Sequence, residues 1–405
     1  MIRSAEVMHL VARRAAEFGV EIEGSVRFDL ATAAARKDAI VNGIIRGIHG
    51  GLKRRRKNIT FIQGQARFLN DHEIDTGDGR LSFDKAIIAT GARNTVPPIE
   101  GIDEVQYLTN RTALLLDTLP GSMIIIGGGY VGIEFAQIFG RFGTRVTLLG
   151  RNRHLAPGED WELSDLLADY LRAEGIAVQT GTSVKSVRHQ GAEKVVTALV
   201  DGAEAHFGAD TLLLAAGRVA NIDALDPTAS GVVTKAQGFV QVDDQLRTSQ
   251  PHVWAIGDVK GGWMFTHVAT YDGPIAALNA VKGLGRTVDY RVVPRAIFSD
   301  PTLAAVGLSE TEARSRGYDV AVGSAPADGA RAKAIGDNRG RLKAVVDKAT
   351  GQILGFHILA PHGDDLLHEA VAAMHDGGTI ERISKSIHIH PTLSEMVKAA
   401  AKAAR

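Results

Sequence analysis

Residues 122–142 read SMIIIGGGYVGIEFAQIFGRF, and this stretch decides the fold. It predicts a buried strand, a glycine-rich turn and a helix that begins near Val131. Gly127, Gly129 and Gly132 have the GxGxxG spacing, which permits a tight turn, close approach of a pyrophosphate and close helix–strand packing. Because the first N–H groups of a helix have no partner within it, the stretch predicts a dinucleotide-binding site.

The end of the following strand indicates which dinucleotide binds. An NAD site places Asp or Glu there to bind the ribose 2′-hydroxyl. This chain reads VTLLGRNR over 146–153, with Gly150 at that point, followed by Arg151 and Arg153. Two guanidinium groups without a carboxylate favour a 2′-phosphate, so the sequence predicts NADPH, with NADH as the alternative.

Strands and helices alternate on both sides of this stretch, which predicts a parallel sheet. The predicted strands lie at 59–68, 72–77, 81–91, 144–150, 176–181, 183–200, 210–217 and 252–258, and the predicted helices at 1–20, 27–58, 160–174 and 265–283. After Val293 the pattern becomes a meander of strands closed by helices, which predicts an α+β domain. Its strands are expected at 294–299, 303–307, 319–325, 341–347 and 351–359, and its helices at 309–316, 364–376 and 392–402.

Composition excludes several classes of function. At about 150 residues per domain, 405 residues predict two or three domains. The 46 basic and 46 acidic residues balance, so no basic field favours nucleic acid as a partner. The sequence has no cysteine, which excludes disulfides, thiolate nucleophiles and cysteine-ligated metals. The most apolar stretch, Met123–Ile133, is too short to span a membrane, and we expect a cytoplasmic protein.

Two other strand ends predict contacts to a second nucleotide. Ala89-Thr90-Gly91 ends one apolar strand, and small residues there permit close approach of the backbone to a ligand. Ile256-Gly257-Asp258 ends another, where Asp258 can accept hydrogen bonds from a ribityl chain. Segments 87–93 and 213–219 resemble each other, which suggests two related nucleotide-binding halves.

A His–Glu pair near the carboxyl end predicts acid–base chemistry. His390 can transfer protons near neutral pH, and Glu395, five residues later, can orient its imidazole. Such a pair is also common as a purely structural contact. His388 and His390 alternate in an extended segment and should point apart, and no acidic or cysteine cluster accompanies them. The sequence therefore predicts no metal site.

Taken together, these motifs resemble the FAD-dependent pyridine nucleotide–disulfide oxidoreductases, a family that includes lipoamide dehydrogenase, glutathione reductase and mercuric reductase. The resemblance runs in family order along essentially the whole chain. It rests on the segments IIATGAR, IIIGGGYVGIEFA, LLAAGR, VWAIGDV, FTHVATYDG, IFSDPTLAAVGLSE and HIHPTLSE.

The resemblance implies two Rossmann-like nucleotide-binding domains, the FAD one incomplete, followed by an α+β dimerisation domain. The implied domains are FAD-binding at 1–106 and 222–292, NAD(P)-binding at 107–221 and dimerisation at 293–405, in a homodimer that acts on a disulfide or small-molecule substrate. Tyr130 matches a ring that gates the nicotinamide pocket, and Glu134 a carboxylate that pairs with a lysine near the flavin. His390 and Glu395 match the dyad that reaches the partner subunit's dithiol. The implied cofactor contacts are Gly127, Gly129, Gly132, Arg151, Arg153, Gly217, Ala89, Thr90, Gly91, Gly257, Asp258, His267 and Ala269.

The chain departs from the family pattern at its start. The family begins with its own strand–GxGxxG–helix for FAD and a C-x4-C redox pair, and this chain matches the family only from beyond the second cysteine. Three interpretations follow: a reductase shortened at its amino end, a cysteine-free flavin oxidase or diaphorase, or an NADPH-binding dimeric pseudoenzyme. The DNA upstream of Met1, translated in frame, is expected to encode the missing motifs if the first interpretation holds.

Overall fold

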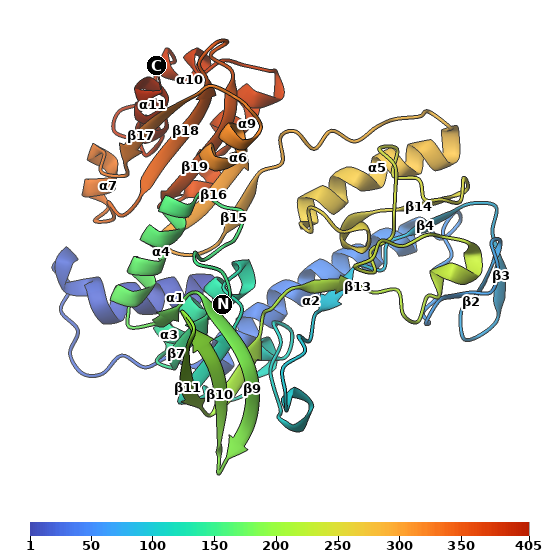
Figure 1. The fold of residues 1–405 in the computed structure, drawn as a ribbon, viewed down its shortest axis with the longest axis horizontal. Coiled ribbons are helices and arrows are strands. Elements are labelled where there is room, and N and C mark those ends of the chain that lie inside the picture. The colour runs from blue at the N-terminus through green and yellow to red at the C-terminus, as the bar shows by residue number, and fades with distance from the viewer. Residues whose placement is uncertain (405) are drawn as a thin grey trace. The chain divides into compact units, whose positions relative to one another are not determined.

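The structure, a computed structural model, describes residues 1–404 and divides into two compact units (Figure 1). Unit 1 comprises residues 1–37, 96–216 and 291–405, and unit 2 comprises residues 38–95 and 217–290. Helix α2 (Leu30–Arg54) contributes residues to both. The domain boundaries predicted from the sequence stay a prediction.

The parallel sheet of unit 1 has the strand order β12-β6-β7-β8. The strands are β6 (Ser122–Ile126), β7 (Arg145–Leu149), β8 (Ala177–Gln179) and β12 (Thr211–Leu214). All five residues of β6 are buried, because its neighbours β12 and β7 pair with both of its edges. Helix α3 (Tyr130–Phe142) returns the chain from β6 to β7, and α4 (Trp161–Ala173) from β7 to β8, as the alternating pattern predicted.

A three-stranded antiparallel sheet follows, made of β9 (Thr182–Gln190), β10 (Glu193–Val200) and β11 (Ala203–Ala209) in the order β11-β10-β9. Val187 and Val196 of this sheet pack in one hydrophobic core with Ile124 and Leu212 of the parallel sheet. The antiparallel sheet packs against the parallel sheet through this core. Helices α3 and α4 form a second core with residues of β6 and β7.

The carboxyl-terminal part of unit 1 is a five-stranded antiparallel sheet, orange to red in Figure 1. Its order is β15-β16-β19-β18-β17, from β15 (Arg295–Ile297), β16 (Thr302–Gly307), β17 (Val320–Pro326), β18 (Arg341–Asp347) and β19 (Ile353–Ala360). Every residue of β19 is buried. The accompanying helices are α6 (Glu310–Ser315), α7 (Ala330–Ala334), α8 (Gly363–Leu366), α9 (His368–His375), α10 (Glu381–Ser384) and α11 (Ser394–Ala403).

Unit 2 contains short strands, the helix α5 (Thr266–Lys282) and residues 38–54 of α2. Strands β1 (Arg67–Phe68), β2 (Glu73–Asp75) and β3 (Arg80–Ser82) form one sheet. Strands β4 (Ala86–Ile88) and β14 (Val253–Ala255) pair in parallel, and β5 (Ala92–Asn94) pairs antiparallel with β13 (Arg218–Ala220). Of these strand pairs, only β4 and β14 are parallel, as in a nucleotide-binding α/β sheet.

Two predictions about the amino-terminal segments are wrong. Residues 59–66 are not a strand, because no neighbouring segment among residues 1–404 pairs with them; only the end of the predicted strand, β1, finds a partner. The second prediction concerns helix α1 (Ile2–His9), which irregular helical turns continue to Phe18. The helical spacing of Val7, Leu10, Val11 and Ala15 predicts an apolar face, but Val7 and Leu10 are 46% and 45% exposed and that face is not buried. The helix packs instead through Ala5 against α3.

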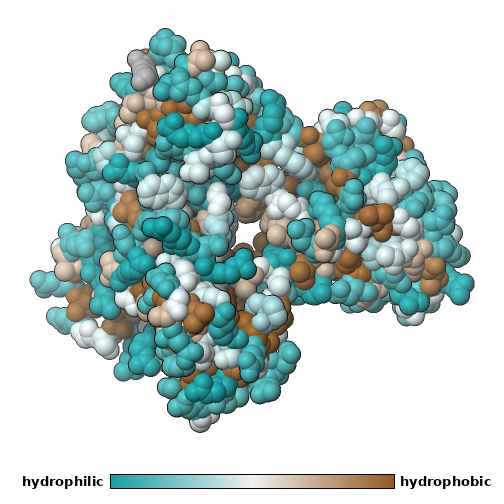
Figure 2. Space-filling model, viewed as in Figure 1, coloured by the Kyte–Doolittle hydropathy of each residue, from teal (hydrophilic) through white to brown (hydrophobic). Residues whose placement is uncertain are grey.

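The surface mixes hydrophilic and apolar side chains on the face shown in Figure 2. Helix α2 carries three strongly exposed isoleucines at i, i+4 and i+8: Ile40, Ile44 and Ile48. Within residues 1–404, none of the helices is both long enough and apolar enough to cross a bilayer.

Candidate functional site

In the glycine-rich turn between β6 and α3, Gly127 and Gly132 pack closely against other backbone atoms, whereas Gly129 has open space at its Cβ position. Gly127 has φ +130°, and a Cβ there would lie 2.2 Å from the Ala215 carbonyl oxygen. A Cβ on Gly132 would lie 1.8 Å from the Gly127 oxygen, so only glycine permits this crossing of turn and helix. Gly129, the residue before the first turn of α3, has nothing within 4 Å of its Cβ position. A ligand can therefore approach the helix N-terminus at Gly129.

The carboxyl end of β7 lies beside this turn. Its last residue is Leu149, and Gly150 continues the edge by donating its N–H to the Gln179 oxygen at 2.7 Å. Arg151 and Arg153 follow, both exposed, and neither guanidinium has an ion-pair partner among residues 1–404. The strand end thus presents two cations and no carboxylate, as the sequence predicted.

Tyr130, the first residue of α3, is held by a contact that the sequence did not predict. Its hydroxyl donates to Glu159, and Arg295 Nε donates to the same Glu159 oxygen, Oε1, at 2.7 Å. Burial, and then the Glu159 carboxylate, raise the pKa of the Tyr130 phenol above its ordinary value. Tyr130 is therefore a neutral hydrogen-bond donor, and its role as a gate for nicotinamide stays a prediction.

Glu134 lies one turn further along α3. It is half-buried, and its Oε1 accepts a hydrogen bond from the Phe298 backbone N–H at 3.0 Å. Burial raises the pKa of this carboxyl, while the Phe298 N–H acts in the opposite direction. The predicted pairing of Glu134 near a flavin is not tested by these contacts.

In unit 2 the two predicted strand ends leave the same edge. Strands β4 and β14 run in parallel, and the Ile256 N–H donates to the Ile88 oxygen at 3.0 Å. Ala89-Thr90-Gly91 and Gly257-Asp258 therefore leave one edge of the pair, where ligands of open α/β sheets bind. Gly91 and Gly257 both have positive φ, at +71° and +68°.

Three residues that the sequence did not predict hold the Gly257–Asp258 turn. The wholly buried Asp272 accepts the Gly257 N–H at 3.1 Å, and Lys260 lies 3.4 Å from the same carboxylate oxygen. Arg218 forms an ion pair with Asp258 at 2.7 Å. The members of these pairs are separated by 12 to 40 residues along the chain, so no local pattern indicates the contacts.

Three further predicted contacts lie near these turns in unit 2. Gly217 has φ +121° and precedes β13. Ala269, in the first turn of α5, is next to Gly257, whose Cβ position lies 3.1 Å from the Ala269 Cβ. The His267 ring stacks on Phe265 with centroids 5.3 Å apart. Their cofactor contacts stay predictions.

The predicted His–Glu pair is present at the start of α11, with His390 before the helix and Glu395 in its first turn. His390 Nδ1 lies 3.0 Å from Glu395 Oε1, and the imidazole side chain is 72% exposed. The Thr392 N–H, and then His390, hold the pKa of Glu395 below its ordinary range. His388 instead contacts Glu369 at 3.0 Å and is nearly buried, so the two imidazoles have separate partners. No group of three metal-ligating side chains occurs among residues 1–404.

The residues of unit 1 fit a dinucleotide, because the open Gly129 position and the bare N-terminus of α3 face a ligand while Gly127 and Gly132 face the protein. In unit 2, the turns after β4 and β14 fit the sugar-like part of FAD. Within 38–95 and 217–290, no GxGxxG turn connects a strand to a helix for the FAD pyrophosphate. The fit to FAD is therefore limited to one part of that cofactor.

A dinucleotide-type turn, a parallel sheet and an antiparallel domain that carries a His–Glu pair indicate a dinucleotide-binding protein with a candidate acid–base pair. Residues 7–273 match the model of the pyridine nucleotide-disulphide oxidoreductases, and residues 293–401 match the dimerisation domain of the same family. The chain belongs to the pyridine nucleotide-disulphide oxidoreductase family. The predicted fold class and the predicted class of FAD-dependent, NAD(P)H-dependent oxidoreductases are confirmed at the level of this family.

Known relatives agree with this assignment. A mercuric reductase from Lysinibacillus sphaericus is 33% identical over 402 residues, which are 99% of this chain and 73% of that protein. A dihydrolipoyl dehydrogenase from Bacillus subtilis is 34% identical, with 100% of this chain and 88% of that protein covered. The structure of the HOCl-induced flavoprotein disulfide reductase RclA from Escherichia coli superimposes with a TM-score of 0.86 at 31% identity, covering 100% of this chain and 89% of that one.

Proposed function

We propose that this chain binds NADPH at the turn between β6 and α3 and uses it as a hydride donor. The observation that carries the proposal is the open Gly129 position, next to which two exposed arginines follow β7. The free N–H groups of α3 would bind the pyrophosphate, and Arg151 with Arg153 would bind the 2′-phosphate.

FAD, when bound, would accept that hydride and pass its electrons to an acceptor. In this proposal Gly91, Gly257 and Asp258 contact FAD in unit 2, with Ala89, Thr90, Gly217, His267 and Ala269 near it. Asp258 would accept hydrogen bonds from the cofactor's hydroxyl groups, and the Arg218 ion pair would fix the carboxylate in place. In unit 1, Tyr130 would gate the nicotinamide pocket and Glu134 would act beside the flavin.

The exposed His390 would move the proton that accompanies reduction of the acceptor. Glu395 orients the imidazole through Nδ1, which leaves Nε2 free to face an acceptor. A disulfide is the acceptor that the family favours, and the finer choice among lipoamide, glutathione, mercury, quinone and oxygen stays open. We further propose a cytoplasmic homodimer, supported by the dimerisation domain at 293–401.

The absence of cysteine favours a second candidate, in which electrons pass from the flavin directly to oxygen or a quinone. The two candidates are separable with the full chain supplied with FAD. NADPH-dependent oxygen consumption by protein that absorbs near 450 nm supports the second candidate. NADPH binding by a colourless protein that retains no FAD would contradict both candidates and support the pseudoenzyme interpretation.

Arg151→Glu tests the choice of dinucleotide. A carboxylate at this position would repel the 2′-phosphate, so we expect at least a tenfold loss of NADPH affinity with little change for NADH. Calorimetric titration of both dinucleotides measures the preference. Arg145→Glu, at the other end of β7 and equally exposed, is the control and should leave the preference unchanged. An unchanged preference in Arg151→Glu would show that the 2′-phosphate binds elsewhere.

His390→Gln tests the electrostatics of the pair. The Thr392 N–H bond remains in this variant, so the pKa of Glu395 should rise only part of the way to its ordinary value. Carbon-13 NMR of glutamate-labelled protein during an acid titration measures this pKa. Because the carboxyl titrates low in the native protein, its contact with His390 should persist as pH falls and be lost only below the ordinary carboxyl range. A Glu395 pKa that does not move would mean that His390 contributes nothing to it.

A further inference from the structure

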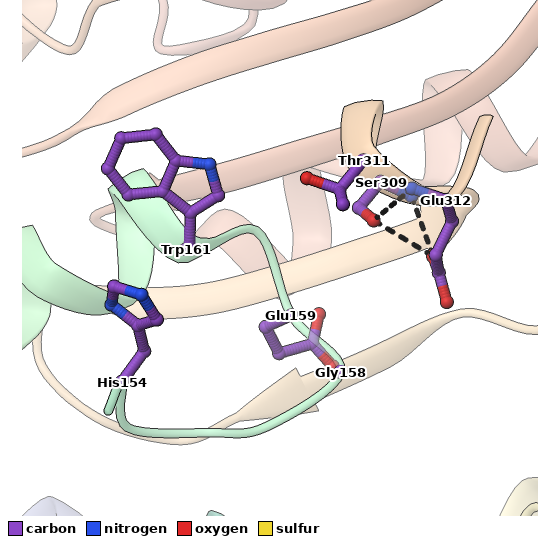
Figure 3. A pocket seen from close by; sticks show the side chains of 7 residues that line it. All are labelled: His154, Gly158, Glu159, Trp161, Ser309, Thr311 and Glu312. Carbon is purple, nitrogen blue, oxygen red and sulfur yellow. Dashed lines mark hydrogen bonds between the residues drawn. The ribbon is translucent and has the colours of Figure 1, made fainter. Parts of the chain in front are cut away.

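A pocket of about 350 Å³ lies inside unit 1, between the segment that follows β7 and the start of α6 (Figure 3). His154, Gly158, Glu159 and Trp161 come from the first segment and form one wall. The opposite wall consists of Ser309, Thr311 and Glu312. Glu159 also accepts the hydroxyl of Tyr130, which the proposed function places at the nicotinamide pocket, but none of the seven lining residues is a proposed cofactor contact or a member of the His390 pair.

The side chain of Glu159 is the polar centre of this pocket. It is only 4% exposed, and its Oε1 accepts hydrogen bonds from both Arg295 and Tyr130. Its second oxygen, Oε2, is buried and has no hydrogen-bond partner among residues 1–404. A buried acceptor without a donor is costly, by about 1–3 kcal/mol, so this oxygen favours a ligand that brings a donor.

The other lining groups also favour a positively charged ligand. The His154 and Trp161 rings lie 5.8 Å apart on the same wall, and the His154 ring is held by Asp165 at 2.7 Å. On the facing wall, Glu312 accepts from Ser309 in the capping box of α6. Two carboxylates and an indole therefore line the pocket without a lysine or arginine side chain. Arg295, ion-paired with Glu159, balances only one of the two negative charges, so the pocket favours a cation over an anion, and a cation also gains from the indole face.

Both walls are held by buried contacts rather than by flexible loops. Next to Glu159, the Asp160 side chain caps α4 by accepting the Leu163 N–H and forms an ion pair with the buried Lys343 of β18 at 2.8 Å. The capping box of α6 fixes Ser309 and Glu312. The pocket is therefore preorganised, which lowers the entropic cost of binding.

We propose that this pocket binds a small organic cation with a primary ammonium or guanidinium group. One N–H of the cation donates to Glu159 Oε2, and its aliphatic part lies against the Trp161 ring. A bare metal ion does not suit the pocket, because no group of three metal-ligating side chains occurs among residues 1–404. None of the residues that line the pocket is a proposed contact of NADPH or FAD, so binding can be tested in their absence.

Calorimetric titration of the full chain with n-butylammonium chloride tests the site, with butan-1-ol as the neutral analogue of similar shape. We expect saturable binding of the ammonium and at least tenfold weaker binding of the alcohol, because only the ammonium carries a charge opposite to that of Glu159. Equal binding of both compounds, or no binding of the ammonium, would show that the pocket is an apolar or water-filled space and would overturn the proposal.

Two variants locate the bound cation. Glu159→Gln should weaken n-butylammonium binding about tenfold or more, since the hydrogen bond loses its charge. Trp161→Ala should weaken it by about three- to thirtyfold, and because this side chain is 48% exposed the variant should fold even if Glu159→Gln does not. Glu162→Gln removes a neighbouring carboxylate that does not line the pocket, and it should bind as the native protein does. Native affinity in Trp161→Ala would place the cation elsewhere and overturn the proposal.

Discussion

Replacing Gly132 with alanine should abolish NADPH binding and lower the free energy of unfolding by about 3 kcal/mol or more. The added Cβ would lie 1.8 Å from the Gly127 carbonyl oxygen, a distance that forces the turn and α3 apart. Alanine is the better helix former by about 1 kcal/mol, but this gain is smaller than the cost of the steric overlap. Urea unfolding measures the stability, and the quenching of protein fluorescence on addition of NADPH measures the binding.

Gly129→Ala is the matched control for that experiment. Its Cβ would have nothing within 4 Å, and its φ of −89° suits any residue, so the free energy of unfolding should change by less than about 1 kcal/mol. NADPH binding should still weaken, because the methyl group occupies the side from which the pyrophosphate approaches. Equal stability of the two variants would mean that the turn can open without cost, and the close packing at Gly132 would not be required.

Replacing Lys343 with methionine should cost about 3–5 kcal/mol of stability. The Lys343 ammonium, 2% exposed, lies 2.8 Å from Asp160 and 3.2 Å from Glu162. Burial acts to lower its pKa, but Asp160 and Glu162 raise the pKa above its ordinary value, so the group is charged. Methionine keeps the length of the side chain and removes the charge, which leaves the buried Asp160 without its partner.

Lys348→Met is the control for the ion pair. Lys348 contacts Asp319 at 2.9 Å, but both side chains are more than half exposed, and such pairs contribute about 0–1 kcal/mol. Urea unfolding of both variants under one set of conditions separates the two kinds of pair. A loss below about 1 kcal/mol in Lys343→Met would show that water reaches Asp160 once the ammonium is removed. Adding Asp160→Asn to Lys343→Met should recover part of the stability, because the unpaired charge is then gone.

Most elements of the fold were predictable because their signals are local. The apolar run before Gly127 and the helical spacing after it predicted β6 and α3 to within a few residues. The five strands of the carboxyl-terminal sheet were predicted equally well. The strand at 59–68 failed for the opposite reason: its alternation of apolar residues is real, but a strand requires a neighbour, and residues 59–66 have none among residues 1–404.

In the candidate site, too, local motifs predicted some residues, and distant contacts that no motif indicates supplied the others. GxGxxG spacing located Gly127, Gly129 and Gly132, and two positive charges in place of a carboxylate located Arg151 and Arg153. The partners of Tyr130 and Asp258 could not be predicted from local patterns. Glu159 lies 29 residues from Tyr130, and Arg218 lies 40 residues from Asp258. The pocket around Glu159 has no signature at all in the sequence, because its two walls are about 150 residues apart.

The sequence by itself determined the elements and the position of the dinucleotide turn, because each depends on residues within about twenty positions of one another. It also determined the family, because several such local motifs occur in a specific order along the chain. Tertiary structure alone decided which buried charges are paired, which face of α1 is covered and where a carboxylate oxygen is left without a donor. The physical reason is that burial and hydrogen bonding are set by which distant segments pack together. A local pattern limits those choices, and the packed core selects among them.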